Sequence, residues 1–221
     1  MAQEYFEDAL EIFRSLPNSY KANEQIMSIL AYRNNNEKLT NFYENISNKN
    51  EYLEHYYSLM SDHKKLVDLY KKKSMKTSLT KTEVVAYAFS LLKTENYDSV
   101  ISLLKPYFEN PLLTDGAIIV NYQYARLKRE RSRADKIKAK IKEKIFDNKF
   151  IDYSNFEKLG GACVIGDRNE IISYLSKIIK ANPLDKYIVR DWPILEPYLT
   201  DAKIINLLSP SEKKLKQTKE K

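Results

Sequence analysis

The chain has 221 residues, and 43% of them are hydrophobic, which is enough for a core in one domain or in a short repeat array. Only four glycines and seven prolines occur, which favours helices joined by short turns. No apolar run reaches the roughly 18 residues of a membrane span. The acidic N-terminus shows no signal peptide, and the single cysteine excludes an intrachain disulfide. These features predict a helical protein of the cytoplasm that does not contact membranes.

The first predicted element is an amphipathic helix over residues 3–16, in which Phe6, Leu10 and Phe13 share one face. Pro17 follows its last residue. This helix is interpreted either as an N-terminal capping helix or as the second helix of a repeat. In the second case the chain was cut from, or descends from, a longer protein.

Four pairs of amphipathic helices are predicted next, and each pair is joined by a short polar turn. They cover residues 20–33 with 36–47, 49–60 with 63–73, 81–93 with 97–108, and 115–129 with 132–147. Turn and N-cap signals such as Ser61-Asp62 and Glu95-Asn96 separate the helices within a pair. The last of these four pairs is the least regular, because Lys138 stands where the others have a large apolar residue.

The stretch from Ser154 to Pro183 carries the most regular pattern. Its motif residues are Phe156, Leu159, Gly160, Cys163, Gly166, Asp167, Ile171, Leu175 and Pro183. The apolar members form one stripe on each of two helices, and Gly160 lacks a Cβ, so that another helix can approach closely. This pattern resembles a tetratricopeptide repeat, with Phe156 for the usual Trp and Cys163 for the usual Tyr.

The same register recurs upstream. The residues that correspond to Ile171 are Ala134, Val100, Leu66 and Leu39, at spacings of 37, 34, 34 and 27 residues. These spacings cluster on the family's period of about 34. The resemblance therefore implies an all-α fold, a right-handed α-solenoid of about five helix pairs with a capping helix at each end. The implied repeats cover residues 20–47, 48–80, 81–114, 115–150 and 152–183, within a single domain over 1–208.

Residues 184–208 resemble the cap that follows the last repeat of many bacterial arrays. The resemblance rests on Asp191-Trp192-Pro193 and Leu195-Glu196-Pro197, and a short helix is expected over 200–208. Trp192 is expected to be largely buried against the second helix of the last pair, over Tyr174 or Ile178. Residues 209–221 are basic with few apolar side chains, which predicts a disordered tail.

The sequence carries no signature of catalysis, and neither a cofactor nor a metal is expected. His55 and His63 are the only two histidines, and they are expected to be solvated helix or turn residues rather than metal ligands. Cys163 is expected to be a buried, inert thiol. The glycines of 160–166 lack the Lys-Ser/Thr of a phosphate-binding loop, so helix packing explains them better.

Basic charge is concentrated in one region. Residues 126–144 hold ten Lys/Arg and three Asp/Glu. Their local net charge of +7 equals the net charge of the whole chain. The candidate residues of this basic patch are Arg126, Lys128, Arg129, Arg131, Arg133, Lys136 and Lys140. The lysines recur at every second residue and therefore fan around a helix rather than lining one edge. A solvated or partner-binding face, complementary to an acidic protein, is favoured over nucleic acid.

In the resembled family, the first helices of the pairs line a concave groove that binds peptides. The corresponding positions here are Glu24, Ser28, Glu51, His55, Val85, Phe89, Ile119, Gln123 and Arg126. The basic carboxylate clamp of the family's chaperone-tail binders is missing. Two acidic residues near one end and apolar residues in the middle fit a peptide or helix with an apolar centre and a basic end.

The sequence thus predicts a non-enzymatic interaction scaffold or adaptor. Two alternatives stay open. One is a sensing or regulatory repeat module that derives from, or works with, a larger effector protein. The other is nucleic-acid binding through residues 126–144.

Overall fold

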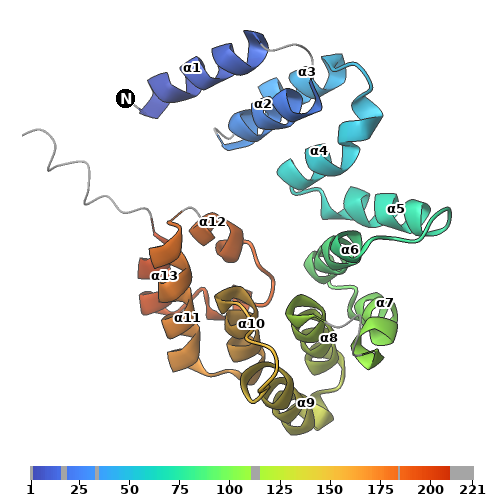
Figure 1. The fold of residues 1–221 in the computed structure, drawn as a ribbon, viewed down its shortest axis with the longest axis vertical. Coiled ribbons are helices and arrows are strands. Elements are labelled where there is room, and N and C mark those ends of the chain that lie inside the picture. Colours follow the sequence, from blue (N-terminus) through green and yellow to red (C-terminus); the bar gives the residue numbers. More distant parts are fainter. Residues whose placement is uncertain (1, 16–18, 33–34, 111–114, 184, 210–221) are drawn as a thin grey trace, which may run out of the picture. The chain divides into compact units, whose positions relative to one another are not determined.

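A computed structural model describes residues 2–15, 19–32, 35–110, 115–183 and 185–209. The protein is all-α, and the described residues form thirteen α-helices that pack largely against their neighbours in sequence (Figure 1). The chain divides into two compact units, unit 1 (residues 1–83) and unit 2 (residues 84–221). Of the helices in the described ranges, none is both long and apolar enough to cross a membrane.

Unit 1 consists of helices that follow the predicted pairs closely. They are α1 (Ala2–Ser15), α2 (Tyr20–Tyr32), α3 (Asn36–Asn45), the 3-10 helix η1 (Lys49–Tyr52), α4 (Leu53–Leu59) and α5 (His63–Ser74). Helix α2 packs against α1, α3 and α4, and α4 packs against α5. The expected helix over 49–60 therefore begins as a tighter 3-10 turn.

Unit 2 begins within α6 (Lys81–Lys93) and contains the remaining elements. They are α7 (Tyr97–Glu109), α8 (Gly116–Arg129), the 3-10 helix η2 (Arg131–Arg133), α9 (Ala134–Ile141), the π-helix η3 (Lys142–Phe146), α10 (Asn155–Ile165), α11 (Arg168–Ala181), α12 (Asp185–Arg190), the 3-10 helix η4 (Glu196–Tyr198) and α13 (Ala202–Leu208). The short helix α12 was not expected from the sequence, whereas α13 was.

Side-chain caps fix where most second helices of the pairs begin. Asn35, Asp62, Asn96 and Asp167 each accept a hydrogen bond from a backbone N–H in the first turn of α3, α5, α7 and α11. Such bonds satisfy N–H groups that have no partner inside the helix. Helix α9 lacks this cap: it follows η2, and Arg133 at its N-cap position makes no capping hydrogen bond. The irregular fourth pair in the sequence is thus also irregular in structure.

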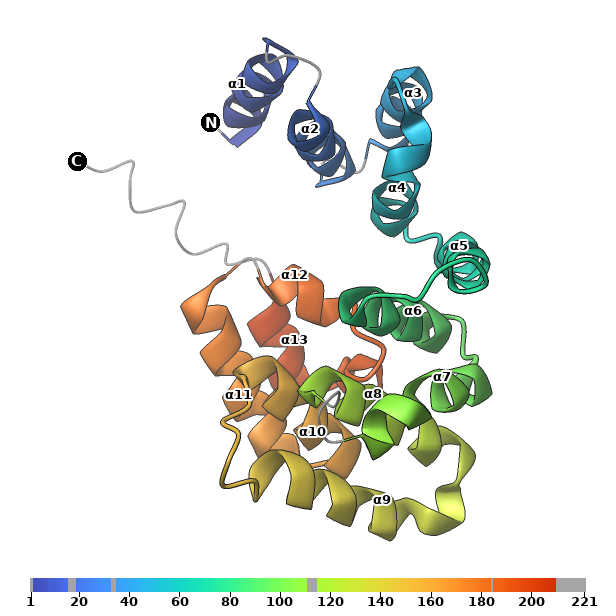
Figure 2. The same ribbon diagram turned by 45° about the vertical axis from the view of Figure 1, so that its right-hand side comes forward.

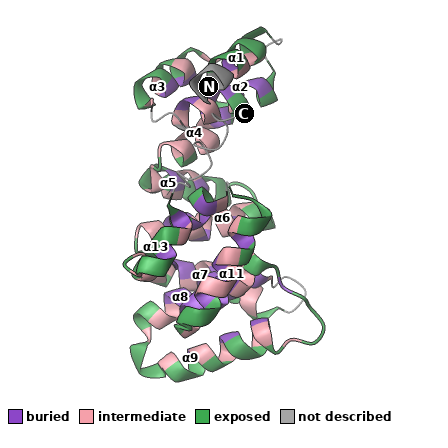
Figure 3. Cartoon of the chain, turned by 90° about the vertical axis from the view of Figure 1, so that its left-hand side faces the viewer, coloured by how far each residue is buried: buried purple, intermediate pink, exposed green. Residues whose placement is uncertain are grey.

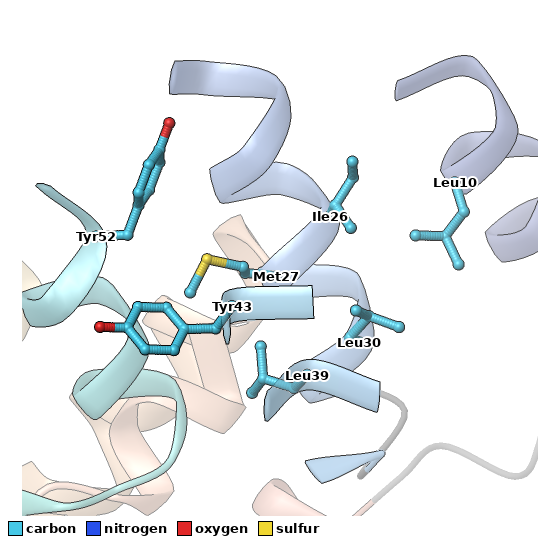
Figure 4. Packing of buried hydrophobic residues seen from close by; sticks show 7 residues of the cluster. All are labelled: Leu10, Ile26, Met27, Leu30, Leu39, Tyr43 and Tyr52. Carbon is cyan, nitrogen blue, oxygen red and sulfur yellow. The ribbon is translucent and has the colours of Figure 1, made fainter. Parts of the chain in front are cut away.

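The core of unit 1 lies between α1, α2, α3 and η1 (Figure 4). Its buried residues are Leu10, Ile26, Met27, Leu30, Leu39, Tyr43 and Tyr52. Leu30 lies three and four positions after Met27 and Ile26 in α2, and Tyr43 lies four after Leu39 in α3, as expected for the apolar stripes of amphipathic helices. The expected alignment of Leu10 with the core is confirmed, whereas the side chain of Phe6 lies outside the described residues.

The core of unit 2 is built around α8. All residues from Ile118 to Ala125 are buried, including the polar Asn121 and Gln123 (Figure 3). Helix α8 packs against α7, α9 and α10, which explains why it is covered on several sides. Elsewhere in this unit the predicted apolar positions Val100, Leu104, Ile171 and Leu175 are each fully buried.

Candidate partner-binding surfaces

Four of the predicted groove residues lie on one surface of unit 1, which we call the α2–α4 face. Glu24, Ser28 and His55 are half-buried, and Glu51 is exposed. The two polar residues of α2 are one helical turn apart, and so are Glu51 and His55 on η1 and α4. The contact between α2 and α4 brings these two rows together.

A hydrogen-bonded bridge joins α2 to α4 at this face. The Ser28 Oγ donates to the Glu24 carbonyl of its own helix at 2.8 Å, and the His55 Nε2 lies 3.2 Å from both the Ser28 Oγ and the Glu24 carbonyl oxygen. A carbonyl oxygen only accepts hydrogen bonds. The contact between the His55 Nε2 and the Glu24 carbonyl therefore places the imidazole proton on Nε2. This nitrogen is therefore assigned as the donor toward Ser28 as well.

Tyrosines extend the α2–α4 face. The rings of Tyr20 and Tyr52 stack with their centroids 4.7 Å apart, and the Asn23 Nδ2 donates to the Tyr52 hydroxyl at 3.0 Å. Tyr20 is 46% exposed, so one side of this stack faces solvent. Partial burial, a hydrogen bond to Glu24 and nearby carboxylates raise the pKa of Tyr20. The face thus combines aromatic surface with acidic groups, the composition that a basic, partly apolar ligand would fit.

In unit 2 the predicted groove positions are largely covered. Val85 and Phe89 on α6 are half-buried, and the Lys93 ammonium lies 5.9 Å from the centre of the Phe89 ring. Ile119 and Gln123 on α8 are 1% and 0% exposed, so the expectation that they line an open groove is wrong. The helical spacing of Ile119 and Gln123 correctly predicted that they lie on the same side of α8. The spacing alone could not show which residues cover that side.

A segment from the C-terminal region lies over α8 and α10. It comprises residues 191–198, and we call it the cap segment. The Asp191 carboxylate accepts from the Lys93 ammonium at 3.0 Å, and the Tyr124 hydroxyl on α8 donates to the Pro193 carbonyl at 3.1 Å. Ile194 and Leu195 are 1% and 0% exposed. The chain after α12 therefore passes from α6 across α8 (Figure 2).

The cap segment also contacts α10. The Trp192 ring lies against Gly160, where a Cβ would come within 2.8 Å of the indole and 2.6 Å of Val120 on α8. The Tyr198 hydroxyl donates to the Cys163 carbonyl at 2.6 Å, and burial raises the pKa of Tyr198 to about 12. We expected Trp192 to be largely buried against α11. It is partly buried, and its six-membered ring lies against Gly160 of α10, where the missing Cβ leaves room for the ring.

Two polar side chains of α8 have no hydrogen-bond partner among the described residues. They are the Gln123 amide, through both Nε2 and Oε1, and the Asn121 Oδ1. A buried polar group without a partner costs about 1–3 kcal/mol of stability, and an ordered water commonly satisfies it. In the sequence, these two residues stand out only as polar side chains in an apolar helix. Polarity there indicates exposure, whereas both residues are buried.

Most of the predicted basic patch is paired within the protein. The Arg126 guanidinium donates two hydrogen bonds to Glu130, at 2.9 and 2.7 Å, and Arg133 reaches the same carboxylate at 3.2 Å. Arg129 pairs with Asp98 at 2.8 Å, Lys140 pairs with Glu143 at 2.7 Å, and the Lys128 ammonium lies over the Tyr124 ring. Of the seven predicted residues, only Arg131 and Lys136 lack such a partner in the described part of the chain.

The centre of this network is Glu130. Its hydrogen bonds with Arg126, against a smaller opposing effect of partial burial, lower the pKa of Glu130 to about 2. The carboxylate is therefore ionised at neutral pH, and it neutralises part of the local positive charge. Fewer cations of this helix pair are available to an anionic partner than the sequence count of ten suggested.

Within the described residues, His, Cys, Asp and Glu side chains do not gather in groups of three or more that could hold a metal ion. The expected burial of Cys163 is confirmed, and this burial raises the pKa of its thiol, which disfavours the reactive thiolate. The sequence predicted a cap over residues 184–208, but it did not predict that the cap segment bonds to α8 and α10. Comparison of the chain with models of known protein families, with curated proteins and with solved structures found no match in any of the three.

Proposed function

We propose that this protein is a non-enzymatic adaptor of the tetratricopeptide-repeat type, a right-handed α-solenoid of about five helix pairs, and that it binds a peptide or helix on the α2–α4 face. The observation that carries the proposal is the Ser28–His55–Glu24 bridge, which joins the first helices of two consecutive predicted pairs. In the resembled family, first helices line the ligand-binding surface.

The character of the ligand follows from the residues that this face offers. Tyr20 and Glu51 are exposed, and Glu24 and His55 are half-buried. A ligand with a basic group and an aromatic or aliphatic side chain would complement this combination. The corresponding helices of unit 2 are less suitable, because Ile119 and Gln123 are buried and the cap segment bonds to α8 and α10.

Site-specific photocrosslinking tests this proposal. A photoreactive phenylalanine at Glu51 should capture a protein from native lysate, whereas the same residue at Lys72, an exposed position on α5, should capture none or a different set. Glu24→Lys should weaken capture at Glu51 because it reverses a charge that the ligand meets. Capture that requires nucleic acid, lost on nuclease treatment, would favour the nucleic-acid function instead. Equal capture at both positions would contradict a specific α2–α4 site.

A further inference from the structure

One turn of unit 2 displays apolar side chains to solvent. Phe150 is 98% exposed and Ile151 is 48% exposed, and Phe150 is the most exposed large hydrophobic residue in the described ranges. The two residues lie in the connection between η3 and α10 (Figure 2). Isolated apolar residues on a surface are common, but two adjacent ones at this exposure form a protruding apolar tip.

Hydrogen bonds hold this turn in shape. The Asn148 Oδ1 accepts from the backbone N–H groups of Phe150 and Ile151, at 2.9 and 3.1 Å. On the far side of the tip, Tyr153 is buried and Asp152 pairs with Lys158 at 2.6 Å. The chain is therefore fixed before and after the tip, and the local backbone geometry imposes the exposure of Phe150.

The tip follows directly after the most basic part of the chain. Residues 131–150 contain eight Lys/Arg and three Asp/Glu. Lys142 and Lys149 are exposed and make no ion pair with any described residue, whereas Lys140 is paired with Glu143. Helix α9 shows mainly exposed and intermediate residues in Figure 3. The apolar tip thus directly follows the unpaired Lys149 in the chain, and Lys142 lies in η3, the helix that precedes the tip.

We propose that the Phe150–Ile151 tip and the lysines beside it form a peripheral contact site for an anionic lipid surface. Phe150 is open on nearly all sides, so a rigid protein partner would need a deep pocket, whereas a lipid interface surrounds a protruding ring without one. The lysines fan around α9 and η3 instead of lining one edge, and such diffuse charge matches a field of headgroups. This site is separate from the α2–α4 face and does not depend on its function.

Vesicle flotation of the full chain tests the proposal. Wild-type protein should float with vesicles of phosphatidylcholine and phosphatidylserine at roughly 0.1 M salt, where screening acts over about 10 Å, and should not float with phosphatidylcholine alone. Phe150→Ser combined with Ile151→Ser should reduce the bound fraction about tenfold, because the inserted apolar area is lost. Lys142→Glu combined with Lys149→Glu should reduce it by a similar factor.

The matched control is Ile188→Ser on α12, which removes an apolar side chain that is 65% exposed elsewhere in the same unit. It should bind vesicles as the wild type does. The proposal is wrong if wild-type protein does not bind the anionic vesicles, or if the Phe150/Ile151 variant binds them equally well. A loss of a captured acidic protein in that variant, without any vesicle binding by the wild type, would assign the tip to a protein partner instead.

A fluorescent label gives a second measurement. Cys163 is buried, so a cysteine introduced at Ile151 can be labelled selectively with an environment-sensitive dye. Its fluorescence should increase and shift to the blue with anionic vesicles, whereas the same dye at Ile188 should not respond. An equal response at both positions would show nonspecific adsorption and would overturn the proposed site.

Discussion

The two units differ in what packs against α2 in unit 1 and against α8 in unit 2. In unit 1, α2 meets α4 through Ser28, His55 and stacked tyrosines, and part of this face is exposed. In unit 2, α8 is buried along two full turns and bonds to the cap segment through Tyr124. The charge differs as well, because residues 1–83 contain equal numbers of basic and acidic residues, whereas the whole net charge of +7 lies in residues 84–221.

This difference shows that the sequence pattern of a helix does not decide whether its surface stays open to a ligand. A chain segment more than sixty residues downstream of α8 can satisfy the same surface within the molecule. In unit 2 that surface has become part of the core, so substitutions there should act on stability. In unit 1 the comparable residues are bridged but solvent-accessible, so substitutions there should act on binding more than on folding.

The largest effect is expected from Leu195→Ala in the cap segment. Leu195 is 0% exposed, and truncating a buried leucine costs about 2–5 kcal/mol. Trp192 is the only tryptophan, so urea unfolding followed by its fluorescence reports on unit 2. Leu199→Ala, at a half-buried position nearby, should cost less. An unchanged unfolding midpoint for Leu195→Ala would mean that the cap segment is not part of the core.

A second effect of about 1–3 kcal/mol or more is expected from Gly160→Leu. The added side chain would begin within 2.8 Å of both Val120 and Trp192, so α8, α10 and the cap segment would have to move apart. Thermal unfolding followed by circular dichroism measures this loss. Ala139→Leu introduces the same side chain at an exposed position on α9 and should leave the midpoint nearly unchanged. Equal midpoints for both variants would refute the close packing.

A smaller effect, about 1 kcal/mol, is expected from Tyr52→Phe in unit 1. The substitution removes the hydroxyl that accepts from the buried Asn23 amide, but it keeps the ring stacked on Tyr20. Hydrogen exchange of α2 and η1 should speed up, while that of α8 and α10 should not change. Tyr57→Phe, which removes a half-buried hydroxyl, is the control. Faster exchange in unit 2 would show that the two units do not unfold independently.

The smallest effect concerns pH. The pKa of Glu130 is about 2 in the folded protein, below the value of about 4.3 for an unperturbed glutamate. The unfolded state therefore binds more protons between these values, so this stabilisation is complete above about pH 5 and is lost as the pH falls toward 2. Because the ion pair with Arg126 is partly exposed, the loss should be at most about 1 kcal/mol.

Urea unfolding at pH values from 6 to 2 measures this dependence, with the range set by the two pKa values. Glu130→Gln should flatten the acid limb of the wild-type curve, whereas Glu37→Gln, an exposed residue of α3, should not. If both variants follow the wild-type curve, Glu130 does not contribute to acid stability.

The sequence alone determined the helices and most of their ends. Apolar residues at helical spacing and Asn or Asp caps are local signals, and Asn96 with Asp167 begin α7 and α11 where the pattern predicted. The burial of Cys163 and the close approach at Gly160 also followed from local pattern. The predicted fourth pair was the least regular, and there the α-helix is flanked by 3-10 and π turns.

Only the tertiary structure decided which residues are available at the surface. Helical periodicity places Ile119 and Gln123 on one side of α8, but it carries no information about a segment that returns from residue 191. Likewise the count of basic residues between 126 and 144 could not show that Glu130 bonds to both Arg126 and Arg133 and that Asp98 bonds to Arg129. Exposure and charge pairing depend on contacts between residues far apart in the chain, and a local pattern does not encode them.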